Sequence, residues 1–135
     1  MRMKSLSVPA RIDRLDEVAD FVNSVLGDVD MKTELSVRLA VEETFVNIAN
    51  YAYAPGEGEA EIQCGLLSDP RRILIRFSDS GVPFDPTKTG DADTSEEAIM
   101  QRVGGLGIFL VKKNMDEVRY AYEDGKNVLT LIKKL

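Results

Sequence analysis

The chain has 135 residues, of which 44% are hydrophobic and 30% are charged, and its formal net charge is −6. This length suits one domain with a real hydrophobic core, and we expect residues 1–135 to form it. The negative charge argues against direct nucleic-acid binding. Histidine is absent, which excludes Ser-His-Asp triads, histidine metal ligands and a phosphohistidine relay within this chain.

The sequence also indicates the cellular compartment in which the protein is expected to act. No apolar run reaches the roughly 18 residues of a membrane span, and the N-terminus lacks the long apolar stretch of a signal peptide. Cys64 is the only cysteine, so an internal disulfide is excluded. We therefore expect a cytoplasmic protein without a membrane association.

The N-terminal part predicts one strand and two helices. Residues 4–8 have a strand pattern, and apolar residues then follow helical spacing over residues 12–26, with Gly27 as a natural helix end. Asp30 is a suitable N-cap for a longer helix that runs to about Tyr53.

The remaining chain predicts two hairpins, a lid and a helix. The polar residues 85–103 are interpreted as a mobile lid. The other expected elements are strands 59–67 and 72–78, a helix over 106–114, and strands 117–122 and 128–133 joined by a turn over 123–127. This order predicts an α+β, two-layer sandwich, with a mostly antiparallel sheet and helices on one face.

The longer helix carries two polar strips between its apolar residues, so one strip can face water and the other a cleft. Glu43 and Asn47, at positions i and i+4, project to the same point. An asparagine oxygen suits Mg²⁺, and a nearby carboxylate can deprotonate a nucleophile. In the alternative interpretation, Glu43 is an ordinary surface residue.

Asp79 follows an apolar strand and begins the turn Asp79-Ser80-Gly81-Val82-Pro83. Gly81 permits close backbone approach and Pro83 stiffens the turn, so Asp79 can accept a hydrogen bond from an exocyclic amine such as that of adenine. The alternative is a plain turn, because this composition is common in turns.

A glycine cluster opens the next helix, in the segment Gly104-Gly105-Leu106-Gly107. Glycines at a helix start let phosphate oxygens approach the backbone N–H groups. Neither a P-loop nor a dinucleotide-binding pattern is present. The alternative interpretation is a flexible hinge of the lid.

Together, the three segments resemble the GHKL (Bergerat-fold) ATPases, which include gyrase and histidine kinases. The matches are Glu43-x-x-x-Asn47 to the N box, Asp79-x-Gly81-x-Pro83 to the G1 box, and Gly104-Gly105-Leu106-Gly107 to the G2 box. The flanking residues are similar to those of the anti-sigma-factor and serine-protein kinase branch.

The resemblance implies ATP and Mg²⁺ as cofactors, with Glu43 as the catalytic base and Asn47 as the metal ligand. It implies that Asp79 reads the adenine amine, and that Gly81 and Pro83 shape the adjoining wall. The remaining implied nucleotide contacts come from the hinge of the lid, which would lie beside the phosphates. Its residues are Gly104, Gly105, Leu106 and Gly107.

By the same resemblance, the expected function is that of an anti-sigma serine kinase. Such a protein phosphorylates a STAS-type anti-anti-sigma partner, sequesters a sigma factor, and commonly acts as a homodimer. The sequence leaves open a nucleotide-binding switch without phosphotransfer, the catalytic domain of a split histidine kinase, and a plain interaction protein. Tyr51 stands where many relatives have histidine, and Arg102 and Thr130 are further candidates for a lid contact and an adenine contact.

Overall fold

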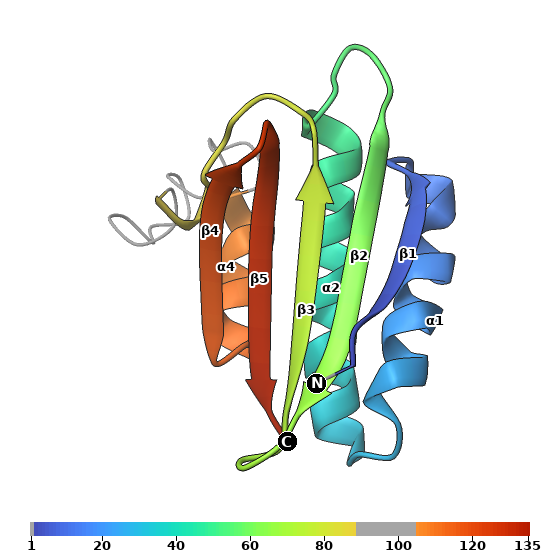
Figure 1. Ribbon diagram of the computed structural model, residues 1–135, viewed down its shortest axis with the longest axis vertical. Helices are drawn as coiled ribbons and strands as arrows, with labels where there is room; N and C mark the ends of the chain where they lie inside the picture. The colour runs from blue at the N-terminus through green and yellow to red at the C-terminus, as the bar shows by residue number, and fades with distance from the viewer. Residues whose placement is uncertain (1, 89–104) are drawn as a thin grey trace.

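The computed structural model describes residues 2–88 and 105–135. Its frame is a five-stranded antiparallel sheet with the strand order β1-β2-β3-β5-β4 (Figure 1). The strands are β1 (Lys4–Pro9), β2 (Glu59–Leu67), β3 (Arg72–Asp79), β4 (Glu117–Glu123) and β5 (Lys126–Lys134). The last two join through Asp124-Gly125 rather than through the wider turn predicted over 123–127. Both turn residues have positive φ angles, of 53° and 76°, as a two-residue hairpin turn requires.

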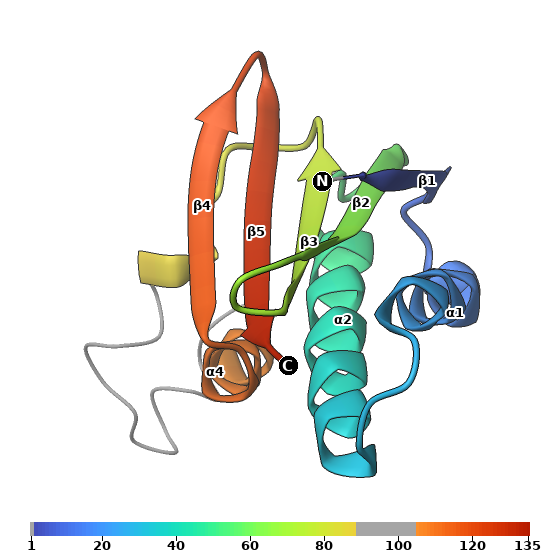
Figure 2. The same cartoon turned by 60° about the horizontal axis from the view of Figure 1, so that its bottom comes forward.

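Within the described residues, three α-helices cover one face of this sheet, as Figure 1 and Figure 2 show from two directions. They are α1 (Leu15–Leu26), α2 (Met31–Tyr51) and α4 (Gly105–Asn114), and short 3-10 helices cover Ile12–Arg14 and Pro86–Lys88. The Asp30 carboxylate caps α2 by accepting a hydrogen bond of 2.7 Å from the Thr33 N–H, as its sequence position predicts. The predicted two-layer α+β architecture is therefore confirmed.

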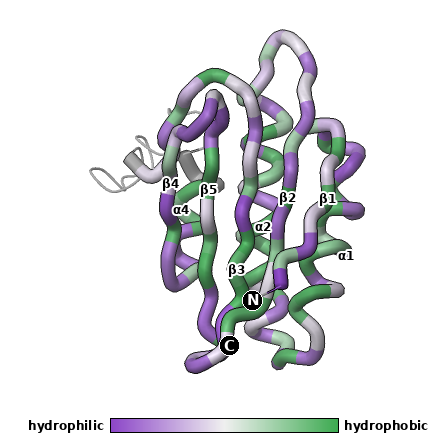
Figure 3. The backbone as a smooth tube through the Cα atoms, viewed as in Figure 1, coloured by the Kyte–Doolittle hydropathy of each residue, from purple (hydrophilic) through white to green (hydrophobic). Residues whose placement is uncertain are grey.

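The core lies between the sheet and α2, because alternate residues of each strand point toward the helices. Phe45 on α2 and Phe77 on β3 are among the largest fully buried side chains. Figure 3 shows hydrophobic residues recurring along the central strands and the helices behind them, while the turn that joins β2 to β3 is hydrophilic. Leu35 and Leu39 lie on the solvent side of α2, at 59% and 36% exposure.

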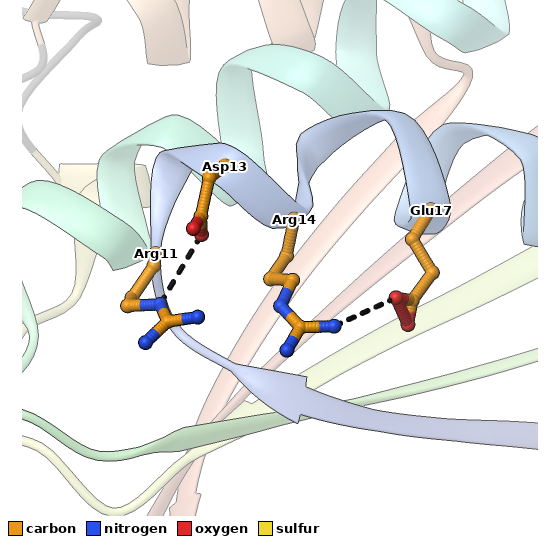
Figure 4. A network of polar contacts seen from close by, with 4 residues as sticks. All are labelled: Arg11, Asp13, Arg14 and Glu17. Atoms are coloured by element: carbon orange, nitrogen blue, oxygen red, sulfur yellow. Dashed lines mark hydrogen bonds and ion pairs between the residues drawn. The ribbon is translucent and has the colours of Figure 1, made fainter.

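Ion pairs lie on the surface around the first turn of α1. At the start of α1, Arg11 pairs with Asp13 and Arg14 pairs with Glu17, each at 3.2 Å (Figure 4). These pairs are solvent-exposed, so each contributes little to stability. No helix within residues 2–88 and 105–135 combines the length and the apolar character that crossing a membrane demands.

Candidate functional site

A cavity of about 390 Å³ opens where the second half of α2 meets the end of β3. It is lined mainly by apolar side chains, with a few polar groups directed into it, which is typical of small-molecule sites. The lining residues come from α2, β3, the segment after β3, α4, β4 and β5, and they include Glu43, Asn47, Tyr51, Asp79, Pro83, Tyr120 and Asn127. The site thus joins segments that are far apart in sequence.

The α2 wall of the cavity holds two buried polar atoms that have no hydrogen-bond partner. These are Thr44 Oγ1 and Asn47 Oδ1, within the part of the chain that the structure describes. Glu43 lies on the same wall, one turn before Asn47. Buried polar atoms are nearly always satisfied in native proteins, so two unpartnered atoms on side chains that line one cavity favour a ligand as their partner.

The opposite wall is organised around Asp79, the last residue of β3, which is 7% exposed. Its Oδ1 accepts hydrogen bonds from the Gly81 N–H at 2.9 Å and from Asn127 Nδ2 at 3.0 Å. Its Oδ2 receives no hydrogen bond from the residues described. The network therefore holds the carboxylate in one orientation and leaves one oxygen able to accept a hydrogen bond from a ligand amine.

Asn127 on β5 holds this wall together, because it faces Asp79 across the β3–β5 pairing. Its Nδ2 also donates to the Val82 carbonyl at 2.9 Å, and its Oδ1 accepts from the Phe84 N–H at 3.1 Å and from the Tyr120 hydroxyl. Burial raises the pKa of Tyr120, so its phenol remains a neutral donor near pH 7. One asparagine thus fixes the aspartate and the turn that follows it.

The turn after β3 packs directly on the end of α2. The Val82 N–H donates to the Ala52 carbonyl at 3.1 Å. A Cβ atom at Gly81 would lie 2.2 Å from that carbonyl oxygen, so only glycine fits this approach. This contact explains the glycine of the turn and links the Asp79 wall to the helix that carries Glu43 and Asn47.

The structure brings together most of the predicted site residues. Glu43, Asn47, Asp79 and Pro83 line the cavity, and Gly81 lies in the adjoining turn. Gly105, Leu106 and Gly107 form the first turn of α4, whose later residues Ile108 and Val111 reach the cavity. Gly104, Arg102 and most of the predicted lid lie outside the described residues.

Thr130 was the wrong choice of a final-strand contact. It pairs with Arg76 and Arg119 and lies on the face of the sheet away from the helices, whereas Asn127 and Leu129 point into the cavity. Thr44 and Tyr120 also line the cavity, although the sequence did not predict them as site residues. The available signal was the Asp-Gly pair before β5, which predicts a two-residue turn and so sets which residues of β5 face the cavity.

The family model for the histidine kinase-like ATPase domain matches residues 8–133, nearly the whole chain and all of the cavity's walls. The chain belongs to the histidine kinase-like ATPase domain family. The predicted GHKL resemblance is therefore confirmed, and the cavity corresponds to a site within an ATPase-type domain.

Relatives of this histidine kinase-like ATPase domain include named kinases. Over 97 residues it is 35% identical to the serine-protein kinase RsbW of Listeria monocytogenes serovar 1/2a, covering 69% of this chain and 61% of that protein. It is 33% identical to RsbW of Bacillus cereus strain AH187 over 97 residues, or 69% of this chain and 59% of that one. The matched region is thus less than two thirds of either relative.

Two solved structures share the fold. A structure of the RsbU and RsbW domains of Rv1364c from Mycobacterium tuberculosis superposes with a TM-score of 0.67 at 16% identity, over 100% of this chain and 33% of that one. The histidine kinase domain of the Erythrobacter litoralis EL346 blue-light-activated histidine kinase superposes with a TM-score of 0.54 at 15% identity. This superposition covers 95% of this chain and 62% of that one. At these identities, the two likenesses describe the architecture alone.

Proposed function

We propose that this protein binds ATP with Mg²⁺ in the cavity and transfers the γ-phosphoryl group to a serine of a partner protein. The observation that carries the proposal is the meeting of three groups in one cavity: the Glu43 carboxylate, the unpartnered Asn47 oxygen and the free oxygen of Asp79. Each supplies a different chemical requirement of a nucleotide-dependent transfer.

The orientation of ATP follows from the direction of α2. Ala52 adjoins the Asp79 turn, so the adenine belongs at that end, with its exocyclic amine donating to Asp79 Oδ2. Glu43 lies nine residues earlier on the helix, about 13 Å along its axis, where the phosphates of an extended ATP belong. The first turn of α4 supplies backbone N–H groups for phosphate oxygens.

Asn47 is the protein group that best fits a magnesium ion. Its Oδ1 is a hard neutral ligand, buried and without a partner. No cluster of three or more His, Cys, Asp or Glu side chains that suits a metal occurs among the described residues. Mg²⁺ typically shares its shell between few protein ligands, substrate phosphates and water, and it neutralises phosphate charge when bound.

Glu43 is proposed as the general base. It accepts the proton of the serine hydroxyl as the serine oxygen forms a bond to the γ-phosphorus. The bond from that phosphorus to the β–γ bridging oxygen breaks, and ADP leaves with that oxygen. Positioning and electrostatic stabilisation supply most of the rate in such transfers, so a rigid Asp79 wall contributes by holding the nucleotide in place.

The partners are proposed from the named relatives. The names of the RsbW serine-protein kinases favour a serine acceptor. The resemblance to the anti-sigma branch implies that this serine belongs to a STAS-type anti-anti-sigma protein, with a sigma factor as the sequestered partner. We propose that the protein alternates between these two partners in the cytoplasm, as a homodimer, and that nucleotide occupancy of the cavity sets the exchange.

The test compares Glu43→Ala with Glu42→Ala. Glu42 is the preceding residue on α2, and its carboxylate pairs with Arg38 at 2.7 Å outside the cavity. Calorimetric titration measures ATP affinity, and γ-labelled ATP with a STAS-type protein from the same genome measures transfer. We expect Glu43→Ala to bind ATP like the wild type and to lose transfer by about 100-fold or more, with Glu42→Ala unchanged.

The same assay separates the alternatives. Transfer by Glu43→Ala at the wild-type rate refutes the assignment of the base. ATP binding by the wild type without transfer to the tested partner favours a nucleotide-dependent switch. Label that is lost in acid indicates phosphohistidine rather than phosphoserine, and so a split histidine kinase.

A further inference from the structure

Thr44 is a buried polar residue of the cavity to which the proposed mechanism gives no role. Its side chain lines the α2 wall, the residue is 3% exposed, and its hydroxyl has no hydrogen-bond partner. It lies one helical turn before Asn47, which carries the other unpartnered buried atom. Both side chains line the cavity, so the two atoms belong to neighbouring side chains of one wall.

An unpartnered threonine hydroxyl inside a helix calls for an explanation. Such a hydroxyl usually bonds to a carbonyl three or four residues earlier, and here the Ala40 carbonyl lies four residues before it. A buried unsatisfied hydroxyl lowers the stability of the fold. Valine has nearly the same shape as threonine and would fill the position without this cost. In this structure the hydroxyl is unsatisfied, and an acceptor atom of a bound ligand would satisfy it.

The chemistry of the ligand atom is inferred from the cavity lining and from the hydroxyl group itself. Ile48, Ile108 and Val111 also line the cavity, and they offer no polar side-chain atom to the hydroxyl. Asn47 Oδ1 is an acceptor that suits a cation, whereas a threonine hydroxyl can donate. The hydrogen-bond partner that suits the Thr44 hydroxyl is therefore an acceptor atom of the nucleotide, either a base nitrogen or a phosphate oxygen.

We propose that Thr44 is a nucleotide-binding residue whose hydroxyl donates a hydrogen bond to an acceptor atom of the bound nucleotide. This inference rests on the proposed function, because it requires a nucleotide in the cavity. It goes beyond that function by adding a contact from α2 that is independent of the metal.

The test uses Thr44→Val, Thr44→Ser and the matched control Thr130→Val, whose threonine lies on the other face of the sheet. Adenosine, ADP and ATP are titrated by calorimetry in EDTA, so that no metal contributes, and each variant is unfolded in urea without nucleotide. We expect Thr44→Val to weaken ATP binding by about 3- to 10-fold for a neutral acceptor and about 10- to 100-fold for a phosphate oxygen.

Thr44→Ser should keep wild-type affinity, and Thr44→Val should unfold at a higher urea concentration than the wild type. An equal loss for adenosine and ATP places the acceptor on the nucleoside, and a loss confined to ADP and ATP places it on a phosphate. If the wild type binds and Thr44→Val binds equally well, this inference fails and the proposed function stands. If the wild type binds no nucleotide in EDTA but binds ATP with Mg²⁺, this inference fails and the proposed function stands; if it binds no nucleotide in either condition, both fail.

Discussion

Asn127 should be a principal stabilising residue of the cavity wall that is organised around Asp79, and Asn127→Ala tests this. The side chain makes hydrogen bonds to the Val82 carbonyl, the Phe84 N–H, the Tyr120 hydroxyl and the Asp79 carboxylate. A neutral hydrogen bond contributes about 0.5–1.5 kcal/mol to stability, and a bond to a charged group contributes about 1.5–3 kcal/mol. Loss of the three neutral bonds and the bond to Asp79 would therefore lower the free energy of unfolding by about 3–7 kcal/mol before any compensation. Water entering the open cavity restores part of this, so we expect a net loss of about 2–4 kcal/mol.

For a chain of this length, about 1 kcal/mol corresponds to about 3–4 °C, so the melting temperature should fall by about 7–14 °C. Calorimetric or circular-dichroism melting of Asn127→Ala measures this shift, with Thr130→Ala as the control from the same strand. ATP affinity should fall as well, because Asp79 loses a donor that orients it. A melting shift no larger than that of Thr130→Ala would refute the role of Asn127.

Three further predictions concern other parts of the fold. Gly81→Ala should weaken ATP binding, because the added Cβ displaces the turn from the Ala52 carbonyl; titration beside Ser80→Ala tests this, and equal affinities contradict it. Burial raises the pKa of the Cys64 thiol from 9.0 to about 12, so the unfolded state loses this proton first. The free energy of unfolding should therefore fall as pH rises above about 9, by up to about 1.4 kcal/mol per pH unit, and less steeply in Cys64→Ala. Phe45→Ala should cost about 3–5 kcal/mol in urea unfolding, because Phe45 is fully buried; a loss below about 1 kcal/mol would contradict its place in the core.

The sequence alone determined the elements and most of the site. Periodicity and capping predicted the helices and strands, because burial of one face imposes a repeat of about 3.6 residues on a helix and 2 on a strand. The spacing of Glu43 and Asn47 on one helix also needs no tertiary information, since four residues make about one turn. The glycine of the Asp79 turn was predicted for close approach, and the structure identifies the Ala52 carbonyl as the group approached.

Only the tertiary structure decided which polar groups complete the site. Whether Asn127 or Thr130 faces the cavity depends on the register of β5, which a two-residue turn shifts relative to the wider turn that was predicted. Whether the Thr44 hydroxyl has a partner depends on the other segments that line the cavity beside α2. Local patterns fix the conformation of a segment, but hydrogen-bond satisfaction depends on groups distant in sequence that folding brings together.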